Sequence, residues 1–201
     1  MHLAALLAGL SPILSKQPLP KDQQLRGEVL DAIGERLGAA NFLVFGTGYD
    51  SPTWMKANEH GRTYFIEDSR GWVDQQPRSV RAATAMVSYT SQVRSAEADL
   101  HDEAALARLL GRMPSKLRAL AWDQILVDGP EGWNPSAPGR GQSIYAASQL
   151  AGPKTVIFLD DCQRSVEAMY MNFWLLRRGR KLTTYDNGHG GQTCRIGPEE
   201  P

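Results

Sequence analysis

Short, almost continuous apolar runs recur along the chain after residue 40. Each is four or five residues long and rich in β-branched and aromatic residues; the runs are 42–45, 63–66, 124–127 and 155–159. Strands that are covered on both faces have this pattern, because neither set of alternate side chains faces water. A weaker strand is expected within 85–93. The runs therefore predict a parallel sheet that is buried between helices.

Segments with helical periodicity lie between these runs. They predict helices at 51–59, 101–112, 141–150 and 166–178. Beyond the last helix, 181–185 and 192–196 predict two strands, joined by an Asn- and Gly-containing turn that suits a hairpin. Strands alternating with helices, followed by an antiparallel pair, are typical of a doubly wound α/β domain with a mostly parallel sheet.

The first forty residues have a different pattern, which predicts a helical lead-in. Leucines in the first ten residues have helical spacing, and prolines then interrupt the pattern. A second helix is expected from Asp22, a suitable N-cap, to Gly38, because apolar residues repeat at every fourth position between them. We therefore divide the chain into a lead-in, 1–40, and one compact domain, 41–201.

The composition fits a globular protein and excludes several function classes. The chain has 201 residues, 42% of them hydrophobic, and its 22 Lys and Arg balance its 22 Asp and Glu. A net charge of zero gives no overall field that would draw the chain to nucleic acid or to an anionic membrane. No apolar run approaches the roughly 18 residues needed to span a bilayer. We expect a soluble, cytoplasmic protein that binds neither nucleic acid nor a membrane. The sequence does not indicate an oligomeric state.

The two cysteines, Cys162 and Cys194, are too few for a disulfide framework. Neither lies in a pattern that binds metals. We expect ordinary thiols, with a single bridge as the alternative.

A glycine-containing turn follows the first predicted strand, at the end where open α/β sheets bind ligands. Gly46 and Gly48 allow the backbone to turn tightly and a ligand to approach without a Cβ in the way. About twenty residues later the second strand ends in Glu67 and Asp68, which are placed to accept hydrogen bonds from ribose hydroxyls. The turn and the acidic pair predict a nucleoside site; a plain strand-to-helix turn is the alternative for the glycines.

Asp50 stands where a dinucleotide fingerprint has its third glycine. A carboxylate at that helix N-terminus would repel a pyrophosphate, which favours a nucleoside without phosphates. S-adenosylmethionine fits, because its sulfonium and ammonium groups are cationic and tolerate a nearby carboxylate. Asp99, beyond the third strand, is expected to accept a hydrogen bond from the adenine amino group, or else to cap a helix.

Three carboxylates follow the fourth and fifth predicted strands: those of Asp128, Asp160 and Asp161. Like charges this close need a cation, a shared proton or strong donors. A divalent ion such as Mg²⁺, Mn²⁺ or Co²⁺ bound by all three is the simplest solution, and it would activate an acceptor hydroxyl. Without a metal, Asp128 would act as the general base. Asp128 also borders the expected nucleoside site, and a helix cap is the alternative for Asp160 or Asp161.

The loop before the helix at 141–150 carries candidate acceptor-binding residues. Arg140, also a catalytic candidate, can form a two-point contact with a substrate carboxylate or an ion pair with a local acid. Trp133 can stack on a sugar or another ring, or be a buried aromatic residue. Glu131 in the same loop and His189 in the hairpin turn complete the set, with an exposed hairpin position as the alternative for His189.

Together these residues resemble a known family, the plant-type polysaccharide-biosynthesis proteins that include glucuronoxylan 4-O-methyltransferase. The most specific matches are Asn41-Phe42-Leu43-Val44-Phe45-Gly46 with Gly48, Asp50-Ser51 and Trp54, and Ala137-Pro138-Gly139-Arg140 with Ile144-Tyr145. The resemblance implies the Rossmann-like fold of class I methyltransferases that use S-adenosylmethionine. It also implies methyl transfer to the 4-hydroxyl of glucuronic acid on a polysaccharide, with Arg140 facing the uronate carboxylate.

The chain departs from the pattern expected of the plant members. Asp160 falls where their motif is expected to have His. The plant members carry a membrane anchor, and no such segment is seen here, so a Golgi location and a xylan acceptor are expected only if an anchor was removed.

The leading hypothesis is an O-methyltransferase that uses S-adenosylmethionine and acts on a glucuronic acid residue of a glycan or on a related uronate. One alternative keeps this cofactor and is a metal-dependent enzyme for small, catechol-like molecules. The other is a methyltransferase-like domain that binds without catalysis.

Overall fold

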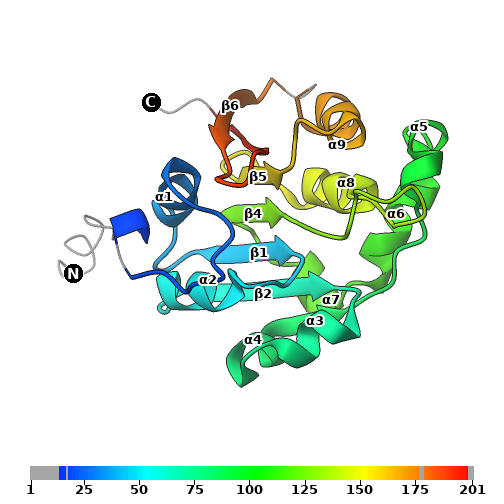
Figure 1. Ribbon diagram of the computed structural model, residues 1–201. Helices are drawn as coiled ribbons and strands as arrows, with labels where there is room; N and C mark the ends of the chain where they lie inside the picture. Colours follow the sequence, from blue (N-terminus) through cyan, green and yellow to red (C-terminus); the bar gives the residue numbers. More distant parts are fainter. Residues whose placement is uncertain (1–13, 17, 177–178, 199–201) are drawn as a thin grey trace.

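A seven-stranded sheet forms the centre of the computed structural model, which describes residues 14–16, 18–176 and 179–198 (Figure 1). Its strand order is β3-β2-β1-β4-β5-β7-β6. The strands are β1 (Asn41–Phe45), β2 (Arg62–Glu67), β3 (Thr84–Met86), β4 (Gln124–Val127), β5 (Val156–Asp160), β6 (Lys181–Asp186) and β7 (Gln192–Gly197). The first five run parallel, and β7 is antiparallel to both β5 and β6. The predicted mostly parallel sheet with a C-terminal hairpin is confirmed.

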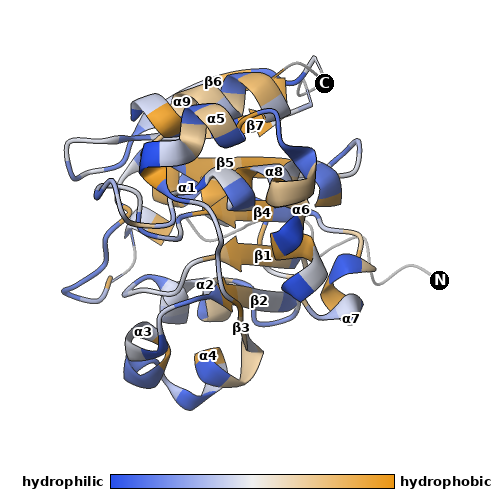
Figure 2. Ribbon diagram, turned by 90° about the vertical axis from the view of Figure 1, so that its right-hand side faces the viewer, coloured by the Kyte–Doolittle hydropathy of each residue, from blue (hydrophilic) through white to orange (hydrophobic). Residues whose placement is uncertain are grey.

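Alternate side chains of the central strands enter two separate cores. Leu43, Ile125 and Ile157 lie in register across β1, β4 and β5 and enter one core. Their neighbours Leu126 and Phe158 enter the other core, on the opposite face. All five are fully buried. Figure 2 accordingly shows hydrophobic residues concentrated in the central strands. Burial on both faces explains why the apolar runs are continuous rather than alternating.

Helices cover both faces of the sheet. The face with Leu43 is covered by α6 (Glu103–Arg112), α7 (Ser115–Arg118), α8 (Gly141–Leu150) and α9 (Ser165–Tyr170). The opposite face is covered by α1 (Glu28–Gly34), α2 (Ser51–Ala57) and α4 (Arg78–Ala83). Shorter elements are η1 (Leu14–Lys16), α3 (Arg70–Gln75), η2 (Val93–Ser95), α5 (Ala96–Asp99) and the π-helical turn η3 (Met171–Leu175). Within the described ranges, no helix has the length and apolar character needed to cross a membrane.

The segment before β1 differs from its prediction. Asp22 is not an N-cap, because α1 begins only at Glu28, after Gly27 with a φ of 65°. A positive φ favours glycine and interrupts a helix. The shorter α1 still buries Val29 and Ile33 against the sheet, so this part of the lead-in belongs to the core. The leucine-rich start of the chain lies outside the described residues.

Other elements also differ from their predictions. The weak strand expected within 85–93 is confined to Thr84–Met86. The helix expected at 166–178 is α9, which changes to a π-helical turn at Met171, and 177–178 lie outside the described residues. Helices α3 and α4 were not expected, because their sequences are mostly polar and each turns only one large apolar side chain, Val73 or Val80, fully inward.

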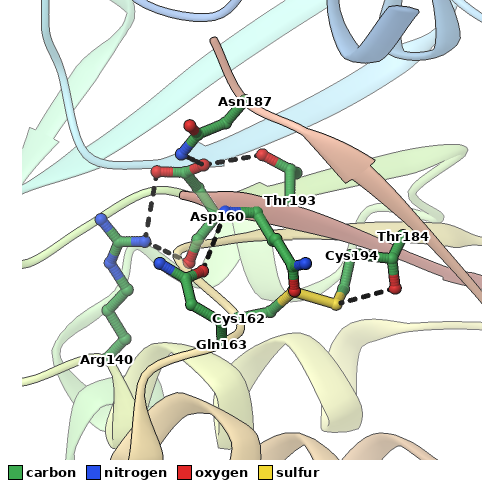
Figure 3. Close-up of a disulfide and its surroundings, with 9 residues drawn as sticks. Arg140, Asp160, Cys162, Gln163, Thr184, Asn187, Thr193 and Cys194 are labelled. Carbon is green, nitrogen blue, oxygen red and sulfur yellow. Dashed lines mark hydrogen bonds and ion pairs between the residues drawn. A yellow bond between two sulfur atoms is a disulfide. The ribbon is translucent and has the colours of Figure 1, made fainter. Parts of the chain in front are cut away.

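The expectation of ordinary thiols is wrong. Cys162 and Cys194 form a disulfide (Figure 3). It links the loop after β5 to β7, next to the backbone hydrogen bond from Cys162 N–H to the Gln192 carbonyl. The single bridge left open by the sequence therefore ties the C-terminal hairpin to the parallel part of the sheet.

We expect the double variant Cys162→Ser, Cys194→Ser to be less stable to unfolding by about 2–4 kcal/mol. The bridge closes a loop of 32 residues, and its removal frees the unfolded chain from that constraint. Urea unfolding with and without reductant measures the effect. Reductant should destabilise the wild type but not the double variant, and equal stability of the two oxidised proteins would contradict the prediction.

Candidate active site

A pocket of about 660 Å³ lies at the carboxyl ends of the parallel strands. It is bordered by Gly46 after β1, Glu67 at the end of β2, Asp128 after β4 and Asp160 at the end of β5. The strand order reverses between β1 and β4, which is where open α/β sheets form their ligand crevices. The volume is within the range of small-molecule sites.

Gly46 is required by the packing of two loops. Its φ is 104°, and a Cβ there would lie 3.0 Å from the Asp128 carbonyl oxygen. A Cβ on Gly129 would in turn lie 2.8 Å from the Gly46 Cα. The loops after β1 and β4 therefore meet backbone to backbone beneath the pocket. Gly48 also borders the pocket, and a Cβ there would meet only the Gln24 side chain, at 3.5 Å.

Asp50 holds the segment before α1 against the site. Its buried carboxylate accepts hydrogen bonds from the backbone N–H groups of Gln24 (2.6 Å) and Leu25 (2.9 Å). Burial raises the pKa of Asp50 to about 6, although these two hydrogen bonds act to lower it. Asp50 does not border the pocket itself, whereas Gln24 and Leu25 do. The structure thus places Asp50 as an anchor for a segment that the sequence did not connect with the site.

Glu67 and Asp68 have different environments. The Glu67 carboxylate is buried and accepts hydrogen bonds from Thr47 N–H (2.6 Å) and Oγ1 (3.0 Å), and from the N–H groups of Asp68 and Ser69. It therefore fixes the turn after β1 to the end of β2. Asp68 is half-buried at the pocket, and burial, helped by the nearby Glu67 charge, raises its pKa to about 6.

Asp99 is not brought to the pocket. It is the last residue of α5, and its carboxylate accepts a hydrogen bond from Ser95 Oγ at 2.6 Å. Strand β3 is only three residues long, so the chain leaves the sheet well before Asp99. The residue lies in a local helical contact rather than beside the expected nucleoside.

Arg140 brings the three predicted carboxylates together. Its guanidinium lies 3.1 Å from Asp128 and 3.1 Å from Asp161. It also lies 3.6 Å from the Asp160 carboxylate and donates to the Asp160 backbone carbonyl (Figure 3). Arg140 is 5% exposed. The three carboxylates therefore lie close together, as predicted. Of the two roles expected for Arg140, the contacts are those of an ion pair with local acids.

Asp160 and Asp128 have opposite pKa shifts within this cluster. Burial alone would raise the pKa of Asp160, but Arg140 and hydrogen bonds from Thr193 (2.7 Å) and Asn187 (3.2 Å) outweigh it and lower that pKa. Burial, together with the Asp160 charge, raises the pKa of Asp128 well above its usual value. Asp160 is therefore the fixed anion, and Asp128 is the group of this pair that takes up a proton more readily.

The third carboxylate is shared between two arginines. Asp161 contacts Arg164 at 2.8 Å as well as Arg140, and its backbone has a φ of 55°. Burial raises its pKa despite both cations. Arg164, at the N-terminal end of α9, was not singled out from the sequence, although it follows the predicted carboxylates by only three residues.

The expected metal site does not fit the contacts of these carboxylates. The Arg140 guanidinium lies among the oxygens of Asp128, Asp160 and Asp161, where the predicted ion would bind. In the described part of the chain, no group of three or more His, Cys, Asp or Glu residues is arranged to hold a metal ion. The guanidinium, a permanent organic cation, pairs with all three carboxylates instead.

The remaining predicted residues border the pocket. Trp133 is 71% exposed and Glu131 lies two residues before it. His189 also borders the pocket, and its ring contacts the Gln24 carbonyl. Asn187, which the sequence did not single out, folds the hairpin turn by accepting from His189 and Gly191 N–H while it donates to Asp160.

The fold is that of class I methyltransferases. One solved structure, described as a putative caffeoyl-CoA O-methyltransferase from Staphylococcus aureus, superposes with a TM-score of 0.54 at 12% identity over 88% of this chain and 86% of that chain. Identity this low shows the fold alone.

The chain belongs to the IRX15/IRX15L/GXM family, whose model matches residues 27–110 and 99–186. It is 32% identical over 155 residues to glucuronoxylan 4-O-methyltransferase 1 of Arabidopsis thaliana, covering 67% of this chain and 55% of the relative. It is 30% identical over 168 residues to arabinogalactan O-methyltransferase 1 of the same plant, covering 73% and 58%. The chain spans little more than half the length of these relatives.

Proposed function

We propose that the chain is an O-methyltransferase that uses S-adenosylmethionine as its methyl donor. The observation that carries this proposal is that two different groups border one pocket. One is the turn after β1 together with the Glu67 carboxylate at the end of β2, and the other is Asp128, which is partly exposed and has a raised pKa. The family relationship to proteins named as O-methyltransferases supports it.

The pocket residues suit this cofactor. Asp68 and the Thr47–Gly48 backbone border the β2 side, and the lining is rich in carboxylates, which favour a cationic ligand. When bound, the cofactor supplies an electrophilic methyl group on its sulfonium sulfur. Glu67 keeps the Thr47 turn in place through two hydrogen bonds.

Asp128 is the general base in this proposal. It accepts the proton of the acceptor hydroxyl while that oxygen bonds to the methyl carbon and the carbon–sulfur bond breaks. A raised pKa makes Asp128 a stronger base than an ordinary carboxylate. The ion pair with Arg140 orients it, at 3.1 Å.

For the acceptor we propose a hydroxyl of a uronic acid group in a glycan, the 4-hydroxyl of glucuronic acid in particular. Relatives named for glucuronoxylan and arabinogalactan support a glycan. The metal-dependent, catechol-like alternative needs a metal site, and the carboxylates expected to form it are paired with Arg140.

Incubation with labelled cofactor tests the proposal. Glucuronoxylan oligosaccharides, arabinogalactan, free glucuronate and catechol serve as acceptors, each in EDTA and with Mg²⁺, Mn²⁺ or Co²⁺. We expect label on the uronate glycans, equal in EDTA, with the new methyl at the 4-oxygen by NMR. Transfer only to catechol with an added ion would support the metal-dependent alternative, and cofactor binding without any transfer would indicate a binding domain.

A further inference from the structure

The acceptor carboxylate proposed above needs a cation, and Arg140 is poorly placed to provide it. Its guanidinium is buried and is shared among three carboxylates of the chain. A fourth carboxylate would have to displace one of them. The other arginine that borders the pocket is Arg164.

Arg164 has a partly exposed side chain and few protein partners. Its side chain is 34% exposed, and its ion pair in the described structure is with Asp161, at 2.8 Å. Asp161 keeps a second partner in Arg140, at 3.1 Å. A ligand can therefore engage Arg164 without leaving a buried carboxylate unpaired.

The loop before α8 passes close to Arg164. A Cβ added to Gly132 would lie 3.7 Å from Arg164 Nη1, which is van der Waals contact, and 2.6 Å from Glu167 Oε1. The glycine is therefore needed for the close approach to Glu167, and it brings the loop next to Arg164. The next residue, Trp133, borders the same pocket and is 71% exposed, an unusual amount for a residue of this size.

The carboxylates at this side of the pocket already have a cationic partner. Asp128, Asp160 and Asp161 are each paired with Arg140. Arg164 adds a second positive charge next to them. A bound carboxylate would have to avoid two acidic side chains, that of Glu131, which borders the pocket, and that of Glu167, which lies close to Gly132.

We propose, on the basis of the function proposed above, that Arg164 binds the acceptor carboxylate and Trp133 stacks on the acceptor sugar ring. A planar guanidinium forms two parallel hydrogen bonds with a carboxylate, and an exposed indole offers a flat apolar face. Specificity for an anionic sugar then depends on Trp133 and on Arg164 at the start of α9. Arg140 positions the aspartates.

Equilibrium binding affinities test this proposal without methyl transfer. Calorimetry with S-adenosylhomocysteine present compares a glucuronate-bearing xylo-oligosaccharide with its carboxyl-reduced form. We expect the wild type to bind the uronate more tightly and Arg164→Met to lose about 10- to 100-fold in affinity for it, the range of a charged hydrogen bond. The reduced oligosaccharide should bind both proteins equally. Arg164→Lys should recover part of the loss, and Trp133→Ala should weaken both ligands.

Arg118→Met, an exposed arginine on α7 away from the pocket, is the matched control and should bind like the wild type. Thermal unfolding of each variant checks that the fold is retained. The inference is overturned if the wild type shows no preference for the uronate, or if Arg164→Met keeps that preference. Methyl transfer is assayed separately: its absence alongside an Arg164-dependent preference would contradict the proposed reaction and leave the binding assignment standing.

Discussion

With Asp128 as the proposed general base, Asp128→Asn is expected to lower kcat by about 100- to 10,000-fold, the usual contribution of such a group. The amide keeps the size of the side chain and can still accept from Arg140, whose Nη2 lies 3.1 Å from Oδ1. It cannot take up the acceptor proton. Cofactor affinity should remain close to that of the wild type, because Asp68, Thr47 and Gly48 border the other part of the pocket.

The pH dependence of the rate identifies the same group. Burial raises the pKa of Asp128 well above its usual value of 3.8. The protonated form cannot act as a base, so kcat should fall as the pH drops through that raised value, at a higher pH than an ordinary aspartate would give. The residual activity of Asp128→Asn should lack this acid limb.

Asp74→Asn is the control for this variant, since Asp74 is an exposed residue on α3 paired with Arg70. It should leave kcat and its pH profile unchanged. An Asp128→Asn enzyme within threefold of the wild-type rate would show that another group takes the proton. Equal losses in kcat and in cofactor affinity, measured by single-turnover kinetics and calorimetry, would place Asp128 in cofactor binding instead.

Much of the sheet could be predicted because its strands are covered on both faces. Runs such as 156–159 are apolar at every position, and this pattern is visible without an alignment. The polar residues that end such runs were found for the same reason: Asp128 and Asp160 follow directly after the last apolar residue of their runs. Helices α3 and α4 escaped prediction because they bury little apolar surface.

The roles within the site depend on contacts between distant residues. Asp50 binds the backbone of Gln24 and Leu25, 25 or 26 residues earlier, and the conformation of that segment has no local signature. Gly46 has the positive φ of a turn glycine, but its close neighbour is Asp128, from another strand. The sequence placed Gly46 directly after the first strand and Asp50 at the start of the next helix, and it left open what each one touches.

The predicted metal site depended on such a contact between distant residues. Three adjacent carboxylates do require a cation, and the sequence offered both a metal ion and Arg140. Arg140 lies 12 residues after Asp128 and 20 before Asp160, so only the fold decides whether its side chain reaches them. It does, and its guanidinium pairs with all three carboxylates.

Arg140→Met is expected to reduce the free energy of unfolding by about 3–5 kcal/mol at neutral pH, the usual cost of removing one partner from a buried ion pair. The substitution keeps an unbranched apolar side chain of similar length but leaves Asp128, Asp160 and Asp161 facing one another. Arg140→Lys should cost less, because it keeps the charge and loses only the planar arrangement of donors.

The deficit of Arg140→Met should shrink on acidification. In the wild type, Arg140 helps to hold the pKa of Asp160 below its unfolded value, so this stabilisation is present above the unfolded pKa and is lost only as the pH falls through the lower folded one. Without Arg140, burial raises the carboxyl pKa values above their unfolded values. The folded variant then binds more protons than the unfolded chain, and its stability rises as the pH falls from neutral toward about 4.

Urea unfolding between pH 5 and 8 measures both effects, and the lower end keeps the variant measurable if it unfolds at neutral pH. Arg118→Met again serves as the control and should follow the wild-type curve. A deficit that is small, or that grows on acidification, would mean that the three carboxylates are compensated by other groups. The double variant Arg140→Met, Arg164→Met separates the two cases. Because Arg164 also pairs with Asp161, the arrangement described here requires the double variant to be less stable at neutral pH than Arg140→Met. If other groups compensate the carboxylates, the second substitution should change the free energy of unfolding little.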